Sequence, residues 1–86
     1  MYNIYTINKE VISIIRVILR EILDKQNRTV YWLSKHTGIT NNNLAFMINN
    51  KTNGIKFDVL DKICEVLNCN VQDILEYVPI NKQENT

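Results

Sequence analysis

The residue types that catalysis requires are scarce in this sequence of 86 residues. It contains one histidine, His36, and two cysteines, Cys64 and Cys69. No nucleophile stands at a useful spacing from a base, and no glycine-rich phosphate-binding loop is present. A zinc site needs four ligands, and the histidine lies far from the cysteines along the chain. The sequence therefore predicts neither an enzyme nor a metal site, and no cofactor is expected.

Three consecutive asparagines, Asn41, Asn42 and Asn43, are the side chains best suited to molecular recognition. Each amide carries both donors and an acceptor for hydrogen bonds. An asparagine can form a bidentate pair with the N6/N7 edge of adenine, which contributes about 1–3 kcal/mol of discrimination. The alternative is that the run reflects only a composition rich in Asn and the preference of Asn for helix N-termini.

Charged residues are segregated along the chain, although the formal net charge is only +1. No acidic residue occurs between Asp24 and Asp58. That window contains His36 and five cations, namely Lys25, Arg28, Lys35, Lys51 and Lys56. A positive surface separated from the acids suits the binding of phosphates. The alternative is a solvated surface on which the cations cluster without a function.

Length and composition indicate one globular domain. Apolar residues make up 45% of the chain, and only one Pro and two Gly are present, which favours helices joined by short connections. No charged stretch precedes an apolar run at the start of the sequence, so no secretory signal is expected. The apolar stretch of residues 11–23 includes Arg16, Arg20 and Glu21 and is too short to span a bilayer. A cytoplasmic protein without a membrane contact is expected.

Residues 29–51 carry the strongest structural signal, which is a pair of short helices joined by a tight turn. Thr29 is a favourable N-cap for the first helix, and Gly38 supplies the positive φ that ends it. Thr40 is the next N-cap, so the second helix runs over about residues 41–49. Leu44 and its neighbours at helical spacing face inward on that second helix.

Three further helices are predicted around this pair, over residues 9–25, 57–67 and 71–77. Asn27 is expected to end the first of them in the left-handed conformation, and Pro79 to stop the last. The inward positions expected for the helix of residues 57–67 are Phe57, Leu60, Ile63, Cys64 and Leu67.

The predicted fold class is therefore all-α, a compact five-helix domain. Its expected parts are an N-terminal arm or weak strand at 1–8, the helical domain at 9–78 and a flexible polar tail at 79–86.

The first half of the predicted helix of residues 9–25 is apolar nearly all round, which exceeds what one small bundle can bury. Either the N-terminal arm or a second subunit is expected to cover the excess. The homodimer hypothesis places its interface at Tyr2, Ile4, Val11, Ile14 and Ile18.

The segment Thr29–Lys51 resembles the helix-turn-helix of the phage-repressor-like, or Cro-type, family. The resemblance extends over roughly residues 15–78. It is closest to short single-domain members with the pattern L-x-x-I-C-x-x-L-N-x-x-x-x-D-I-L-E-Y, which here runs from Leu60 to Tyr77. The resemblance implies a lambda-repressor-like five-helix fold. It also implies a transcriptional regulator, expected to be a repressor, with the second helix of the motif in the major groove of a DNA operator.

The resemblance also implies a set of site residues. The groove-facing positions are Asn41, Asn42, Ala45 and Phe46, of which the last two can contact a thymine methyl. The positions expected near phosphates are Thr29, Lys35, Thr40, Asn43, Asn49, Lys51 and Lys56.

Two departures from the family pattern qualify this expectation. Many relatives carry Gln just after the first N-cap, whereas this chain has Val30. The recognition helix also contains no Arg or Lys, so recognition of guanine by a charged side chain is not expected. The expected site is A·T-rich and palindromic. No pocket for a small-molecule effector is evident.

A protein-interaction module that has lost DNA binding is the main alternative, because a fold does not determine a function. Val30, the low charge and the apolar ring of Phe46 on a polar face favour it. DNA binding requires Arg28, Lys35, Lys51 and Lys56 to share a surface with the start of the recognition helix. An interaction module requires Phe46 to join an apolar patch.

Overall fold

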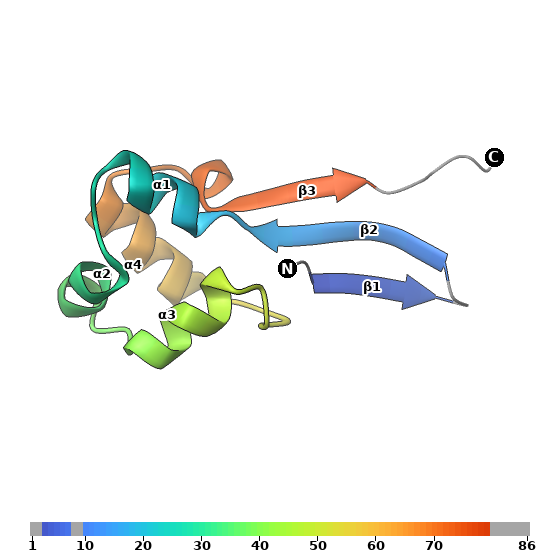
Figure 1. The fold of residues 1–86 in the computed structure, drawn as a ribbon, viewed down its shortest axis with the longest axis horizontal. Coiled ribbons are helices and arrows are strands. Elements are labelled where there is room, and N and C mark those ends of the chain that lie inside the picture. The colour runs from blue at the N-terminus through green and yellow to red at the C-terminus, as the bar shows by residue number, and fades with distance from the viewer. Residues whose placement is uncertain (1–2, 8–9, 80–86) are drawn as a thin grey trace.

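The computed structural model describes residues 3–7 and 10–79, with side chains from Ile14 onward. Four α-helices form one end of the molecule and a three-stranded antiparallel sheet extends from them (Figure 1). In chain order the elements are β1 (Asn3–Ile7), β2 (Glu10–Val17), α1 (Leu19–Lys25), α2 (Val30–Thr37), α3 (Asn41–Ile48), α4 (Phe57–Leu67), the 3-10 turn η1 (Val71–Asp73) and β3 (Leu75–Pro79). The predicted all-α class and the count of five helices are therefore wrong.

The first correction concerns residues 10–17, which were predicted as the first half of a helix and form strand β2. Five of these eight residues are Val or Ile, whose branched Cβ favours a strand. An apolar pattern on all sides is also what a strand in the middle of a sheet shows. The helix begins only at Leu19, and Ile18 is its N-cap residue.

The second correction concerns residues 71–77, where the fifth helix was expected. Asn70 and Asp73 form a reciprocal capping box, so the N-terminal signal is present, but the helix lasts only the 3-10 turn η1. Strand β3 follows and pairs with β2, with Val17 opposite Leu75 and Ser13 opposite Pro79. Pro79 thus ends a strand and not a helix.

The sheet has the order β1–β2–β3, so β2 lies in the middle. The segment expected as an N-terminal arm contributes β1, which pairs with β2 from Asn3 opposite Ile15 to Ile7 opposite Glu10. The expected flexible tail after Pro79 lies outside the described residues.

The hydrophobic core lies between the helices and the end of the sheet nearest to them. Every helix contributes at least one fully buried side chain, and so does the residue before β3. The fully buried set is Leu19, Leu23, Leu33, Leu44, Ile63, Leu67 and Ile74. In the described part of the chain no helix is long and apolar enough to span a membrane.

Candidate nucleic-acid interface

Helices α2 and α3 begin as the sequence predicts, each with a threonine cap. The Thr29 hydroxyl accepts a hydrogen bond from the backbone N–H of Trp32 at 2.9 Å. The Thr40 hydroxyl accepts one from the N–H of Asn43 at 3.1 Å. Each cap satisfies one of the N–H groups that a helix start leaves unpaired, and the remaining ones stay available to an anion.

The turn between the two helices is fixed by local hydrogen bonds. Gly38 has φ +81°, as predicted, and its N–H donates to the carbonyl of Ser34 at 2.9 Å. The Ser34 hydroxyl donates to the carbonyl of Ile39 at 2.6 Å. The side chain of Ser34 therefore ties the end of α2 to the residue that precedes the Thr40 cap.

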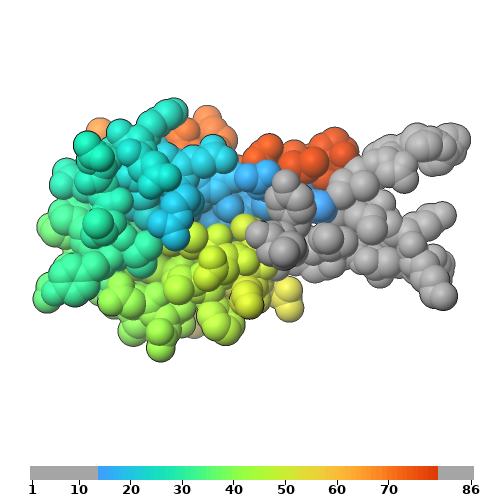
Figure 2. All heavy atoms as spheres, in the orientation of Figure 1, coloured from blue at the N-terminus to red at the C-terminus, as the bar shows by residue number. Residues whose placement is uncertain are grey.

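Helix α3 presents a polar outer side over a buried inner side. Leu44 is fully buried and Met47 is 6% exposed, whereas Asn41, Asn42 and Asn43 are all exposed. The three amides at the start of the helix are thus free to contact a partner. In Figure 2, α3 and the loop after it form one continuous surface at the helical end of the molecule.

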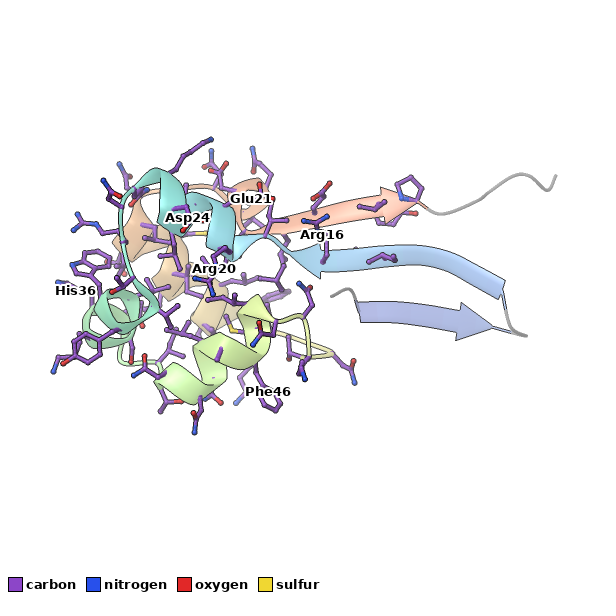
Figure 3. The ribbon with its side chains drawn as sticks, in the orientation of Figure 1. Arg16, Arg20, Glu21, Asp24, His36 and Phe46 are labelled. Atoms are coloured by element: carbon purple, nitrogen blue, oxygen red, sulfur yellow. The ribbon has the colours of Figure 1, made fainter. Side chains whose placement is uncertain are left out.

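The two other residues expected to read bases differ in exposure. Ala45 is half-buried, while Phe46 is 58% exposed and projects from α3 away from the neighbouring helices (Figure 3). Phe46 lies beside a groove of about 300 Å³. The groove is lined by Ile39, Asn43, Phe46, Met47, Thr52, Gly54, Ile55, Lys56 and Val59.

This groove meets one condition from each of the competing sequence hypotheses. Lys56 shares the groove with Asn43 and Phe46, so one of the four expected cations does lie beside the start of α3. Phe46 also joins apolar side chains there, as an interaction module would require.

The remaining candidates for phosphate contact are on the surface. Lys35 and Lys51 are exposed, as is Asn49, which caps the C-terminus of α3. Among residues 14–79, the ion pairs involve Arg16, Glu21, Glu76, Lys62 and Glu65 and none of the cations between Asp24 and Asp58. The positive charge of that window is therefore not neutralised by an acidic side chain within this range.

Trp32 is half-buried, and both ring faces are occupied. The Arg28 guanidinium lies 4.0 Å from the centroid of the indole ring, and the His36 ring stacks on it at 4.1 Å. His36 Nδ1 is also 2.9 Å from the Trp32 carbonyl oxygen. His36 is exposed, so the stack lies on the surface of α2.

Asn50 is a residue that the sequence analysis missed. It is the one buried polar side chain among the described residues, 8% exposed, and has φ +58°. Its side-chain oxygen accepts from the N–H of Val17 at 2.6 Å, and its amide nitrogen donates to the carbonyl of Val17 at 3.1 Å. Asn50 therefore joins the residue after the C-cap of α3 to the last residue of β2. The signal available in the sequence was an Asn just after a predicted helix, where the left-handed conformation is common.

The expected dimer residues are only partly described. Tyr2 lies outside the described residues, and only the backbone of Ile4 and Val11 is described. Ile14 is 3% exposed within the single chain, which leaves it little surface for a partner, and Ile18 is half-buried.

Comparisons with known proteins agree with this geometry. The family model for Cro/C1-type helix-turn-helix DNA-binding domains matches residues 18–79. The uncharacterised helix-turn-helix-type transcriptional regulator YozG of Bacillus subtilis (strain 168) is 41% identical over 56 residues, which cover 65% of this chain and 67% of that protein.

Two crystal structures share the fold. A Bacteroides fragilis protein assigned to DNA binding has a TM-score of 0.65 at 24% identity and covers 72% of this chain and 98% of its own. The transcriptional regulator VanUg has a TM-score of 0.66 at 24% identity and covers 87% of this chain and 97% of its own. At this identity the likeness is one of fold.

Proposed function

Because the chain belongs to the Cro/C1-type helix-turn-helix DNA-binding domain family, we propose that it is a sequence-specific regulator of transcription that acts as a homodimeric repressor. The observation that carries the proposal is the exposed start of α3, where Asn41 and Asn42 follow the Thr40 cap. An α-helix of this kind fits the major groove, and its free N–H groups favour a nearby phosphate.

Base recognition is assigned to Asn41, Asn42, Ala45 and Phe46. The two amides would pair with adenine edges, and the two apolar side chains would contact thymine methyl groups. The absence of cations on α3 argues against recognition of guanine, so the proposed site is A·T-rich. Two recognition helices of a dimer would read half-sites about 34 Å apart.

Contacts to the phosphate backbone are assigned to the flanking positions. Lys35, Lys51 and Lys56 are exposed cations without an acidic partner among residues 14–79. The neutral groups proposed alongside them are Thr29, Thr40, Asn43 and Asn49. These contacts would set affinity and its dependence on salt, while the α3 contacts set specificity. Repression would follow where the bound site overlaps a promoter.

The test is selection from random duplexes by the purified protein at two salt concentrations. Enrichment of an A·T-rich, two-fold symmetric motif, with affinity that falls steeply as salt rises, is the expected result. Asn41→Ala or Asn42→Ala should relax preference at one base pair per half-site by about 1–3 kcal/mol. Lys51→Ala should weaken all sequences alike and reduce the salt slope by about one.

A protein-binding module is the second candidate, and the groove beside Phe46 is the observation that favours it. The same selection separates the two. If no motif is enriched even at low salt, the DNA-binding proposal fails and the apolar groove becomes the surface to examine.

A further inference from the structure

Phe57 departs most from the sequence expectation, because it was predicted to face inward from α4 and is 87% exposed. Its ring lies at the first position of the helix, directly after the Lys56 cap. Three other large apolar side chains near it are also exposed, at 41% for Ile15, 49% for Val71 and 59% for Tyr77. A cluster of this kind on a small soluble domain marks an interaction site.

These side chains belong to one continuous surface. Tyr77 of β3 lies opposite Ile15 of β2, so the two occupy the same face of the sheet. Arg16 and Glu76, the neighbouring opposed pair, lie on the other face, where their charged groups are 3.6 Å apart. The sheet thus has one face with an ion pair and one that exposes apolar side chains.

Two hollows connect the sheet to α4. A groove of about 190 Å³ is lined by residues that include Ile15, Phe57 and Leu75. A groove of about 560 Å³ is lined by Phe57, Leu60, Asp61, Cys64, Cys69, Asn70, Val71 and Leu75. Phe57, Leu60 and Leu75 line both grooves, and Asp61 is the only charged residue that lines either one. We name this surface, made of Ile15, Phe57, Leu60, Val71, Leu75 and Tyr77, the α4–β3 face.

We propose that the α4–β3 face binds a second copy of this chain and forms the dimer that the proposed function requires. A two-fold interface uses the same surface on both partners, so that surface must be complementary to itself. The α4–β3 face carries both a projecting ring, Phe57, and the apolar groove next to it. The two-fold operation can therefore seat the Phe57 ring of each copy in the groove of the other.

The available area agrees with a dimer. If a fully exposed aromatic side chain presents about 200 Å², the four exposed side chains together offer on the order of 400 Å² of apolar surface. A stable interface buries about 800 Å² on each partner, of which roughly 60% is apolar. The half-buried Leu60 and Leu75 supply part of the difference. The absence of cations from the lining matches the low charge of interface centres.

The residues that follow β3 in the sequence are largely polar. Residues 80–86, Ile-Asn-Lys-Gln-Glu-Asn-Thr, contain one apolar side chain. A segment of that composition cannot bury four large apolar groups.

The α4–β3 face is also connected to the DNA-reading side. Thr52, Gly54 and Ile55 line both the smaller of its two grooves and the groove beside Phe46. The loop between α3 and α4 therefore touches both surfaces, so the interface would fix the relative positions of the two α3 helices.

The test is the molar mass of the full chain by sedimentation and by light scattering from low to high micromolar concentration. The wild type should form a dimer, and Phe57→Glu should raise the dimer dissociation constant at least 100-fold. Tyr77→Glu should act in the same direction. Glu at the first position of α4 is favourable for the helix dipole, so Phe57→Glu should retain the native circular dichroism spectrum.

Phe46→Glu is the matched control, because Phe46 is also an exposed phenylalanine but lies on α3. It should leave the dimer intact and reduce DNA binding. A wild type that stays monomeric at 100 µM overturns the proposal, as does a Phe57→Glu variant that dimerises like the wild type. A dimer that responds as expected but enriches no DNA motif upholds this interface while rejecting the proposed function.

Discussion

Replacement of Asn50 by alanine should destabilise the fold more than the same exchange at Asn68 or Thr40. The change removes both hydrogen bonds between the Asn50 amide and the backbone of Val17. The two atoms of Val17 lie in the interior, where a polar group without a partner costs about 1–3 kcal/mol. Alanine also has to adopt the left-handed conformation at φ +58°, at about 1–2 kcal/mol.

The two unpaired groups and the conformational cost together amount to about 3–8 kcal/mol, a large part of the 5–15 kcal/mol that usually separates folded from unfolded domains. Asn50→Gly separates the two contributions, because glycine adopts the left-handed conformation without strain. Asn50→Gly should cost about 2–6 kcal/mol, which is the loss of the two hydrogen bonds alone.

Asn68→Ala is the matched control. Asn68 also has a positive φ, +53°, but its side chain is exposed, so only the conformational cost of about 1–2 kcal/mol applies. Urea unfolding monitored by circular dichroism gives the free energy of unfolding for the wild type and the three variants. The comparison is valid if the free energy of unfolding falls with urea concentration at the same slope in all four. An Asn50→Ala variant no less stable than Asn68→Ala would refute the assignment of the Asn50 bonds as a major stabilising contact.

Three further exchanges test separate features of the structure. Gly38→Ala should lower the free energy of unfolding by about 1 kcal/mol in thermal or urea unfolding, because the residue has φ +81° although an added Cβ would meet no atom within 4 Å. Gly54→Ala is the control and should leave stability unchanged, because Gly54 has no positive φ and an added Cβ there also meets no atom within 4 Å. Thr40→Ala should lose about 1 kcal/mol of stability with the cap of α3, and equal stability to the wild type would contradict the capping bond. The pKa of the Cys69 thiol is raised from 9.0 to about 11, mainly by burial and to a smaller extent by the nearby Cys64 and Asp73. The folded state disfavours the thiolate, so the wild type should lose stability relative to Cys69→Ala as the pH rises from about 9 to about 11. For the same reason iodoacetamide should alkylate Cys69 of the folded protein slowly at pH 8.

The helix-turn-helix was predictable because its signals are local. Thr29 and Thr40 cap helices within three residues of their own position, and Gly38 ends α2 through its own φ. Asn27, expected to be left-handed, has φ +57° for the same local reason. Helix α4 likewise runs from Phe57 to Leu67 as predicted, since its apolar residues repeat at helical spacing.

The sheet was not predictable in the same way, because its strands depend on partners that are distant along the chain. Val17 pairs with Leu75, and no local pattern around either residue identifies the other. Residues 71–77 even begin with a helical capping box, which the pairing of β3 with β2 overrides after Asp73. Periodicity also failed for Phe57, because the side of α4 that it occupies is left uncovered within the single chain.

The roles of the site residues remain predictions. The structure exposes Asn41, Asn42 and Phe46 and leaves Ala45 half-buried. The contact of Asn50 with Val17 could not be foreseen, since it joins two residues on different elements.

The placement of β3 beside β2 has a consequence for the order of folding. Helices and tight turns form from contacts between near neighbours, whereas strands separated by most of the chain must close a long loop and do so more slowly. The four helices can therefore assemble before Leu75 and Tyr77 are in place. Under the proposed dimer, those two residues complete the surface that the partner binds, so subunits would associate only after the last strand has docked. A chain arrested before that step would present a single recognition helix and would bind a half-site at best.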